Sequence, residues 1–250
     1  MHFAAQGWKV WATDIDEARL ATLQEEAKGE LAIHQLDVRD AQAIASSLEA
    51  CVQHFGGMGI AINNAAVITP GRVGKLSDAD IESQIDVNLK GVLHGTNLAG
   101  RLLAKAGQGG HIINLASMAA HAPVPGLGVY SATKFGVRSF SLVASEELGE
   151  FDIAVTAICP DLVDTPMLDL QLEYPEAALT FSGPGALQTK AIVQAVEKAI
   201  RKGPREITIP RWRGWIARFA NLATWAMPIL RKRLEAQGVK QASRYRRTES

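Results

Sequence analysis

His111-Ile112-Ile113-Asn114-Leu115-Ala116 is a short apolar stretch that predicts a buried β-strand. A helical segment from about Tyr130 to Gly149 follows it, and a second apolar strand is predicted at Ile153–Ile158. This order is typical of a parallel strand pair, because parallel neighbours need a long crossover connection that is usually a helix. The stretch therefore predicts the α/β class.

The same alternation extends in both directions along the chain. Further strands are predicted at Trp8–Thr13, Leu31–Leu36, Gly59–Asn63 and Glu206–Ile209. Helices are predicted at Glu17–Ala27, between Asp40 and Gly56, from a capping box at Ser77 and Asp80 through Leu93, and at Lys190–Lys202. Residues 162–188 lack a clear period and predict a long excursion that folds over a site. We expect a doubly wound parallel sheet in a single domain, residues 1–209, followed by an amphipathic segment and basic tail, residues 210–250.

Composition excludes several classes of protein. Lys and Arg (26) balance Asp and Glu (26), so no overall field attracts nucleic acid. A hydrophobic fraction of 47% with 21% charged residues excludes a disordered chain. Cys51 and Cys159 are too few and too far apart for a disulfide framework or a thiol metal site. Together with an N-terminus that lacks a secretory signal, they predict a cytoplasmic protein.

The segment Tyr130-Ser131-Ala132-Thr133-Lys134 places a phenol and an ammonium one helical turn apart on the same face. A positive charge beside a phenol favours the phenolate and lowers its pKa toward the range in which a general acid or base works. Lys134 is a candidate for that charge. The alternative is a half-buried aromatic side chain beside a solvated lysine.

Other polar residues follow the ends of predicted strands, where ligand sites of open α/β sheets lie. With the tyrosine and lysine, they make the sequence resemble the short-chain dehydrogenase/reductase family of the classical type, from residue 1 to about residue 209. The residues that carry the resemblance are Asn63-Asn64-Ala65-Ala66, Asn88, Ser117, Tyr130, Lys134 and the segment from Pro160 to Met167. The resemblance implies a Rossmann-like fold.

The resemblance also implies an NAD(P)-dependent oxidoreductase that interconverts a secondary alcohol and a carbonyl by hydride transfer. Tyr130 is then the general acid/base, and Lys134 lowers its pKa and bonds the nicotinamide ribose. Ser117 orients the substrate oxygen, and Asn88 supports a proton-relay water. The residues by themselves leave open that Ser117 satisfies a turn and that Asn88 bonds nearby backbone. The implied partners are a small-molecule alcohol or carbonyl and further copies of the chain in a dimer or tetramer, without nucleic acid.

Cofactor-binding residues are implied in several segments. Asp14 follows the first predicted strand, where the family carries an acidic residue that accepts hydrogen bonds from the adenosine ribose hydroxyls. A carboxylate there repels a 2′-phosphate, so NAD is favoured over NADP. Capping of the following helix is the alternative for Asp14, and a similar one holds for Asp37. The other implied cofactor-binding residues are Asp37, Val38, Asn64, Ala65, Tyr130, Lys134, Val163 and Thr165.

The sequence departs from the family pattern at three places. Ala66 replaces a glycine after Asn64-Ala65, and Asp161 replaces the glycine that usually follows Pro160. The third departure concerns the family's first strand and its glycine-rich turn, T-G-x-x-x-G-x-G, whose amides bind the pyrophosphate. Neither precedes Trp8, so we expect an N-terminally truncated chain without the central strand. A structural or regulatory paralogue that binds no cofactor and performs no chemistry is the alternative.

The C-terminal segment has a separate pattern. Residues 201–250 carry a net charge of +10, against −10 for residues 1–200. Apolar residues recur there at helical spacing, namely Trp212, Trp215, Phe219, Leu222, Ala226 and Ile229. The pattern fits peripheral contact with an anionic membrane through residues 211–233, a lid over an apolar substrate, or packing against the domain or a partner subunit. The apolar stretch 214–230 is too short and interrupted to span a membrane.

Overall fold

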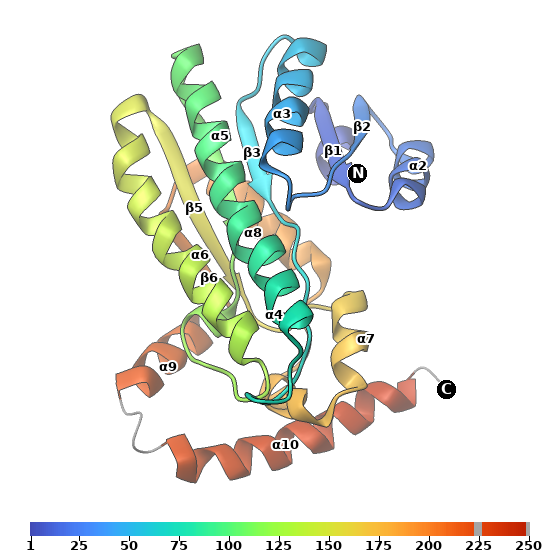
Figure 1. Ribbon diagram of the computed structural model, residues 1–250, viewed down its shortest axis with the longest axis vertical. Helices are drawn as coiled ribbons and strands as arrows, with labels where there is room; N and C mark the ends of the chain where they lie inside the picture. The colour runs from blue at the N-terminus through green and yellow to red at the C-terminus, as the bar shows by residue number, and fades with distance from the viewer. Residues whose placement is uncertain (223–226, 249–250) are drawn as a thin grey trace.

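The structure is a computed structural model that describes residues 1–222 and 227–248, and it has the predicted α/β architecture (Figure 1). The strands are β1 (Val10–Asp14), β2 (Leu31–Gln35), β3 (Ile60–Asn63), β4 (Gly110–Leu115), β5 (Ile153–Pro160) and β6 (Glu206–Ile209). The longer helices are α2 (Glu17–Glu26), α3 (Ala41–Phe55), α4 (Asp78–Ile85), α5 (Gly91–Ala106), α6 (Gly128–Glu147), α8 (Thr189–Lys202), α9 (Arg211–Leu222) and α10 (Met227–Thr248). The shorter ones are α1 (His2–Ala5), η1 (Asp86–Lys90), η2 (Met118–Ala120), η3 (Leu148–Phe151), α7 (Pro166–Leu172) and η4 (Pro175–Ser182).

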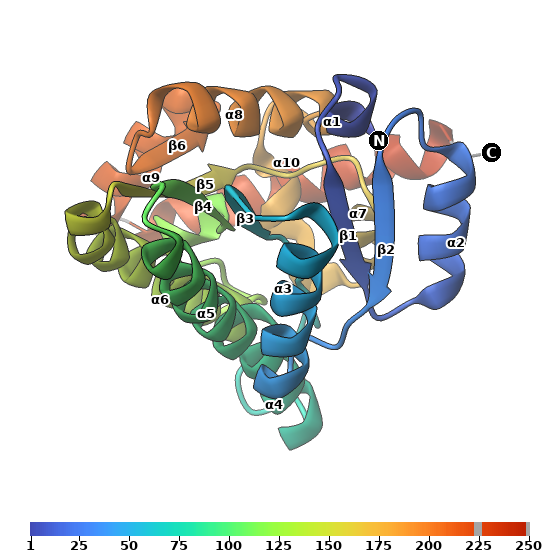
Figure 2. The same ribbon diagram turned by 90° about the horizontal axis from the view of Figure 1, so that it is seen from above.

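The strands of the described residues are all parallel, but they form two sheets. One sheet pairs β1 with β2, in the register Val10↔Leu31, and the other has the order β3-β4-β5-β6. Figure 2 shows the two-stranded sheet standing apart from β3. Ile62 on β3 is 42% exposed, although parallel strands are normally covered on both faces. The sheet is therefore divided between β1 and β3, which is where we expected a central strand.

Helices cover both faces of the four-stranded sheet, as a doubly wound fold requires (Figure 2). One core lies between the sheet and α8 and includes Ile113, Ile158 and Val196. The other lies between the sheet and the pair α5 and α6, and it includes Leu103 and Val155. The sheet of β1 and β2 is tied to α3 by a hydrogen bond from Trp11 Nε1 to Ser47 Oγ, 3.1 Å long. The two sheets thus belong to a single domain, although the strands of one do not pair with those of the other.

The predicted helix caps of α3 and α4 are confirmed. The Asp40 side chain accepts hydrogen bonds from two backbone amides at the start of α3, and Gly56 ends that helix with a φ of 79°. Ser77 and Asp80 form the predicted capping box at α4. The long helix that they open is interrupted by the π-helical turn η1 before it continues as α5.

Two parts of the chain have more structure than the sequence predicted. The excursion at residues 162–188 contains α7 and η4, and α10 packs against it through Ala242 and Tyr245. The C-terminal segment forms two helices, α9 and α10, and Ala226 of the predicted apolar stripe lies outside the described residues. Among the residues that the structure describes, no helix combines the length and the apolar character needed to cross a membrane.

Candidate active site

The tyrosine and lysine of the predicted catalytic motif lie together on α6. Lys134 is only 1% exposed, and its Nζ lies 5.6 Å from the centre of the Tyr130 ring. The ammonium donates a hydrogen bond of 2.8 Å to the backbone oxygen of Leu115, at the end of β4. The alternative of a solvated lysine is therefore wrong, because the side chain passes through the core to the end of the sheet.

Burial shifts the pKa values of both groups. It lowers the pKa of Lys134 from 10.5 to about 8, since the charged form loses its hydration. Burial also raises the pKa of Tyr130 above its ordinary value, and a hydrogen bond with the Ser117 side chain opposes that rise. The expected lowering of the Tyr130 pKa by Lys134 is thus absent here, because the cost of burying a phenolate exceeds the favourable interactions. Tyr130 is a protonated phenol at neutral pH.

Ser117 combines the two roles that the sequence left open. It follows β4 and precedes η2, and its Oγ accepts a hydrogen bond of 3.1 Å from the backbone amide of Ala119. The same side chain interacts with the Tyr130 phenol and opposes the rise of its pKa. A single hydroxyl therefore closes the turn and touches the phenol, so that strand β4 and helix α6 bring the two groups together.

Asn88 lies in the π-helical turn η1 and is fully buried. Its Oδ1 accepts a hydrogen bond of 2.7 Å from the amide of Val67, and its Nδ2 donates one of 2.8 Å to the oxygen of Val67. A longer contact of 3.4 Å joins Nδ2 to Thr133 Oγ1 on α6. The side chain thus fastens the segment after β3 to the long helix, which is the backbone-bonding alternative. The proton-relay role stays a prediction.

The predicted adenosine-binding residues lie at the ends of β1, β2 and β3. Asp14 is exposed, and its Oδ1 accepts a hydrogen bond of 3.0 Å from the amide of Asp16. The cap of α2 is Asp16 rather than Asp14, so the capping alternative for Asp14 is wrong. Asn64 and Ala65 are exposed directly after β3. The adenosine-binding role of these residues stays a prediction.

Asp37 forms an ion pair that was not predicted from the sequence. Its carboxylate forms an ion pair with Arg39, with Oδ2 and Nη2 2.5 Å apart. The hydrogen bonds from Arg39 hold the pKa of Asp37 below its usual value. Val38 follows it and packs against Gly91 at the start of α5. An adenine that bonds Asp37 would share the carboxylate with this guanidinium.

The segment after β5 covers the tyrosine. Val163 pairs with Leu187 in an isolated parallel bridge, and the Thr165 hydroxyl donates to the Val163 oxygen at 3.4 Å where α7 begins. Met167 of α7 packs on the apolar cluster that contains Tyr130. The segment thus packs beside the apolar cluster that contains Tyr130, and its role as a cofactor-covering loop stays a prediction.

Asp161, which replaces the family's glycine after Pro160, forms an ion pair that was not predicted from the sequence. Its Oδ2 lies 3.0 Å from Nε of Arg213 on α9, and both side chains are mostly buried. Burial raises the pKa of Asp161, and Arg213 opposes that shift. The arginine passes so close to Gly183 that a Cβ there would lie 2.1 Å from its Nη1. The charge added next to Pro160 is therefore balanced by the C-terminal segment.

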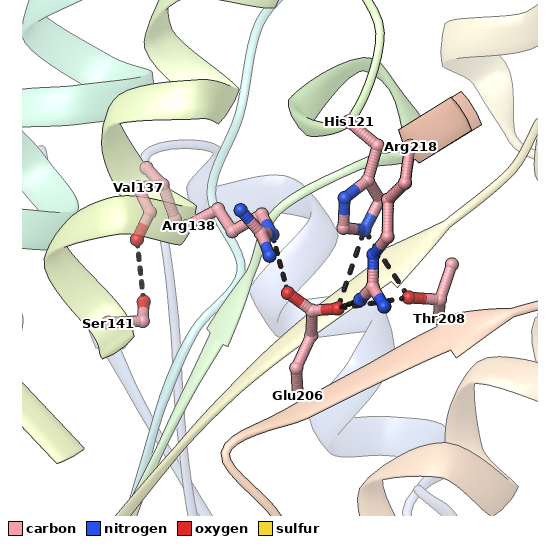
Figure 3. Close-up of polar contacts among 7 residues, drawn as sticks. All are labelled: His121, Val137, Arg138, Ser141, Glu206, Thr208 and Arg218. Atoms are coloured by element: carbon pink, nitrogen blue, oxygen red, sulfur yellow. Dashed lines mark hydrogen bonds and ion pairs between the residues drawn. The ribbon is translucent and has the colours of Figure 1, made fainter. Parts of the chain in front are cut away.

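A second charged cluster lies beside β6 (Figure 3). Glu206 forms ion pairs with Arg138 of α6 and Arg218 of α9, and His121 Nε2 lies 3.6 Å from its carboxylate. The potential ligand atoms of His121, Cys159 and Glu206 lie within 4.8 Å of one another. Two guanidinium groups already bind the carboxylate, and a cation placed there would be repelled by them. We interpret the cluster as an ion-pair network that joins α6, β6 and α9.

Burial also keeps the neighbouring groups of this cluster uncharged. It lowers the pKa of His121 to about 4 and raises the pKa of the Cys159 thiol to about 12. The histidine is therefore neutral, which is the form that binds metals, whereas the thiol is protonated at neutral pH and is not a ready metal ligand in its present form. The arginines of α9 gave a sequence signal, because they recur within a short amphipathic stretch, but their partners are distant in the sequence.

The residues present fit a nicotinamide cofactor in part. The buried Lys134 ammonium, one helical turn from Tyr130, suits the ribose next to a nicotinamide, and the exposed Asp14 carboxylate suits an adenosine ribose. No segment of the 250 residues matches the glycine-rich turn that would hold the pyrophosphate. The fit therefore covers the two ends of the cofactor and not its centre.

The fold and the site together define a Rossmann-like α/β protein with a Ser-Tyr-Lys group at the carboxyl ends of its parallel strands. The chain belongs to the short chain dehydrogenase family, whose family model matches residues 1–174. It is 34% identical to "Probable oxidoreductase EphD" of Mycobacterium tuberculosis (strain ATCC 25618 / H37Rv) over 191 residues, which are 75% of this chain and 31% of that protein. The chain thus matches about a third of the length of that relative.

Two shorter relatives are matched over more of their length. Identity is 32% over 169 residues to "Diacetyl reductase [(S)-acetoin forming]" of Staphylococcus epidermidis (strain ATCC 12228 / FDA PCI 1200), covering 66% of each chain. The chain is 31% identical over 179 residues to "3-oxoacyl-[acyl-carrier-protein] reductase FabG" of Thermotoga maritima, and the match covers 70% of this chain and 71% of that protein. A crystal structure of a short chain dehydrogenase/reductase from Burkholderia phymatum in complex with NAD superposes with a TM-score of 0.79 at 23% identity, covering 90% and 88% of the two chains. This likeness shows the shared fold.

Proposed function

We propose that this protein is an NAD(P)-dependent oxidoreductase that interconverts a secondary alcohol and a carbonyl, with Tyr130 as its general acid/base. The observation that carries the proposal is the buried Lys134, whose ammonium lies 5.6 Å from the centre of the Tyr130 ring one helical turn away. A buried ammonium is costly to the fold, and such a group is typical of a functional site. Relatives named as reductases support the same class of reaction.

When bound, a nicotinamide cofactor supplies the hydride of the reaction. In the reductive direction Tyr130 donates its phenolic proton to the substrate oxygen, which suits a phenol that burial keeps protonated. The Ser117 hydroxyl holds the same oxygen, since it already lies beside the phenol. Lys134 then stabilises the phenolate that remains, because its positive charge lies close by in a site that excludes water. In the oxidative direction the same groups act in reverse.

We propose that NAD is preferred over NADP, because the exposed Asp14 carboxylate at the end of β1 would repel a 2′-phosphate. Since no glycine-rich turn is present in the 250 residues, NAD should bind weakly, with a dissociation constant above the low micromolar range. The binding free energy is then less favourable than about −8 kcal/mol. Calorimetric titration with NAD and with NADP measures both statements. Low-micromolar binding of NAD would contradict the second, and equal affinity for the two would contradict the first.

The catalytic role is tested by Tyr130→Phe, with Tyr174→Phe as the matched control on an exposed tyrosine of the covering segment. Diacetyl serves as the carbonyl probe, with reduction followed by the absorbance of NADH at high cofactor concentration. Tyr130→Phe should lower turnover by about 10²-fold or more and leave cofactor affinity nearly unchanged, whereas the control should do neither. If the wild-type chain neither binds NAD nor reduces any carbonyl, the non-catalytic paralogue becomes the better interpretation.

We further propose a small-molecule substrate and a homo-oligomeric assembly, as the family resemblance implies. Two free, buried cysteines, Cys51 and Cys159, fit a protein that works in a reducing compartment such as the cytoplasm. Sedimentation equilibrium of the purified chain tests the assembly, and a monomer at all concentrations would contradict it.

A further inference from the structure

The outer face of α9 is apolar and exposed. Trp212, Trp215, Ile216 and Phe219 are each more than half exposed, and Phe219 reaches 63%. Their spacing places them on one face of the helix, which we call the aromatic face of α9. Trp215 and Phe219 stack with their ring centres 6.3 Å apart. Four large apolar side chains in a row leave a continuous patch of apolar surface rather than isolated exposed residues.

The opposite face of α9 is fixed to the domain. Arg213 pairs with Asp161 after β5. Arg218 pairs with Glu206 on β6, as Figure 3 shows. Between them Gly214 is buried so closely against Thr208 that a Cβ there would lie 2.5 Å from the threonine Cγ2. Rotation of the helix to bury its aromatic face would break both ion pairs, and it would leave Asp161 without Arg213 and Glu206 without Arg218. The exposure of the aromatic face is therefore built into the docking of the helix.

Charge selects the partner for this face. Helix α9 contains three arginines and no acidic residue. Arg213 and Arg218 are paired with carboxylates of the domain, and Arg211 is exposed at the start of the helix, beside Trp212. Residues 201–250 as a whole carry +10. Figure 1 shows α9 and α10 at the same end of the molecule, so the basic segment is gathered there. Like charges of two copies would repel one another at this face, whereas an anionic surface would be attracted.

We propose that α9 is an interfacial helix that docks the domain on an anionic lipid bilayer, with Trp212, Trp215, Ile216 and Phe219 inserted at the level of the headgroups. Tryptophan and phenylalanine on one face and arginine beside them are the composition of such helices. The inner ion pairs keep the helix folded against the domain, so the bound form needs no rearrangement of α9. The inference stands independently of the oxidoreductase activity.

The test uses the full chain and vesicle flotation. The vesicles are phosphatidylcholine alone, or phosphatidylcholine with about a quarter phosphatidylglycerol, at low and at high salt. We expect binding to the anionic vesicles at low salt, loss of most binding at about 1 M salt, where the Debye length is about 3 Å, and little binding to phosphatidylcholine alone. The double variant Trp215→Ala/Phe219→Ala should bind at least tenfold more weakly. The matched control is Phe151→Ala, which removes an aromatic side chain of similar exposure, 52%, from η3; it should bind as the wild type does.

Three results would overturn the proposal. One is the absence of flotation with anionic vesicles at low salt, and another is equal binding by the double variant and the wild type. The third is a wild-type dimer, measured without lipid, that the double variant does not form. The aromatic face would then be covered by a second copy. Cofactor affinity and diacetyl reduction, measured without vesicles on the same variants, report separately on the oxidoreductase. Circular dichroism confirms that each variant is folded.

Discussion

Replacing Lys134 by methionine is expected to stabilise the protein at neutral pH. The side chain is 1% exposed, so its charge is held in the core. Burial is the main cause of its pKa shift, and no carboxylate is among the groups that shift it. Methionine has a similar length and fills the same apolar channel without a charge. The variant therefore separates the cost of the buried ammonium from the packing of its methylene groups.

The magnitude follows from the pKa of Lys134, which burial lowers from 10.5 to about 8. Each unit corresponds to about 1.4 kcal/mol, so retention of the charge at pH 7 costs the folded state about 3 kcal/mol. The substitution also removes the hydrogen bond to the Leu115 oxygen, and an unpaired buried carbonyl costs about 1–2 kcal/mol. The net gain in the free energy of unfolding is then about 1–2 kcal/mol at pH 7.

The pH dependence identifies the cause of the gain. Because the folded-state pKa lies below the unfolded value, the unfolded chain binds more protons than the folded protein between about pH 8 and 10.5. Wild-type stability contributed by Lys134 therefore rises with pH through this window, and the advantage of Lys134→Met shrinks and disappears above it.

Urea unfolding at pH 7 and at pH 10 measures both quantities. Lys105→Met, on an exposed lysine of α5, is the matched control and should change stability by less than about 0.5 kcal/mol at either pH. The reasoning is refuted if Lys134→Met is less stable than the wild type at pH 7 by more than about 1 kcal/mol. It is also refuted if the difference between the two proteins is the same at both pH values.

Three further predictions concern Asn88, the pair of Asp161 and Arg213, and His121. Asn88→Ala removes both hydrogen bonds to Val67, so denaturant unfolding should show a loss of about 2–3 kcal/mol, and a loss below about 0.5 kcal/mol would contradict the fastening role. Arg213→Met leaves the Asp161 carboxylate buried without its partner and should cost about 3 kcal/mol, most of which Asp161→Asn in the same chain should restore; additive effects in this double-mutant cycle would count against the pair. His121 has a pKa lowered mainly by burial, so wild-type stability should fall as the pH drops from 6.5 toward 4, and His121→Gln should reduce that fall in thermal unfolding between pH 7 and pH 5.

Local patterns in the sequence determined the class of fold and the order of its elements. The capping box at Ser77, the cap at Asp40 and the glycine end of α3 could be predicted because each depends on residues within one or two turns. The placement of Tyr130 and Lys134 on one face of α6 follows from helical periodicity alone. The sequence also predicted the division of the sheet between β1 and β3, because the residues before Trp8 lack the pattern of a strand that would pair with both.

Only the tertiary structure decided what surrounds these side chains. The burial of Lys134, the hold of Asn88 on Val67, and the pairing of Asp161 with Arg213 join residues that are 19 or more positions apart or depend on the whole core around them. Periodicity tells which face of a helix is apolar, but it does not tell which distant element covers that face. For the same reason the sequence left open whether the apolar stripe of α9 contacts a membrane, covers a substrate, or packs against the domain or a partner subunit. It remains exposed because its arginines, through their distant carboxylates, fix the opposite face to the domain.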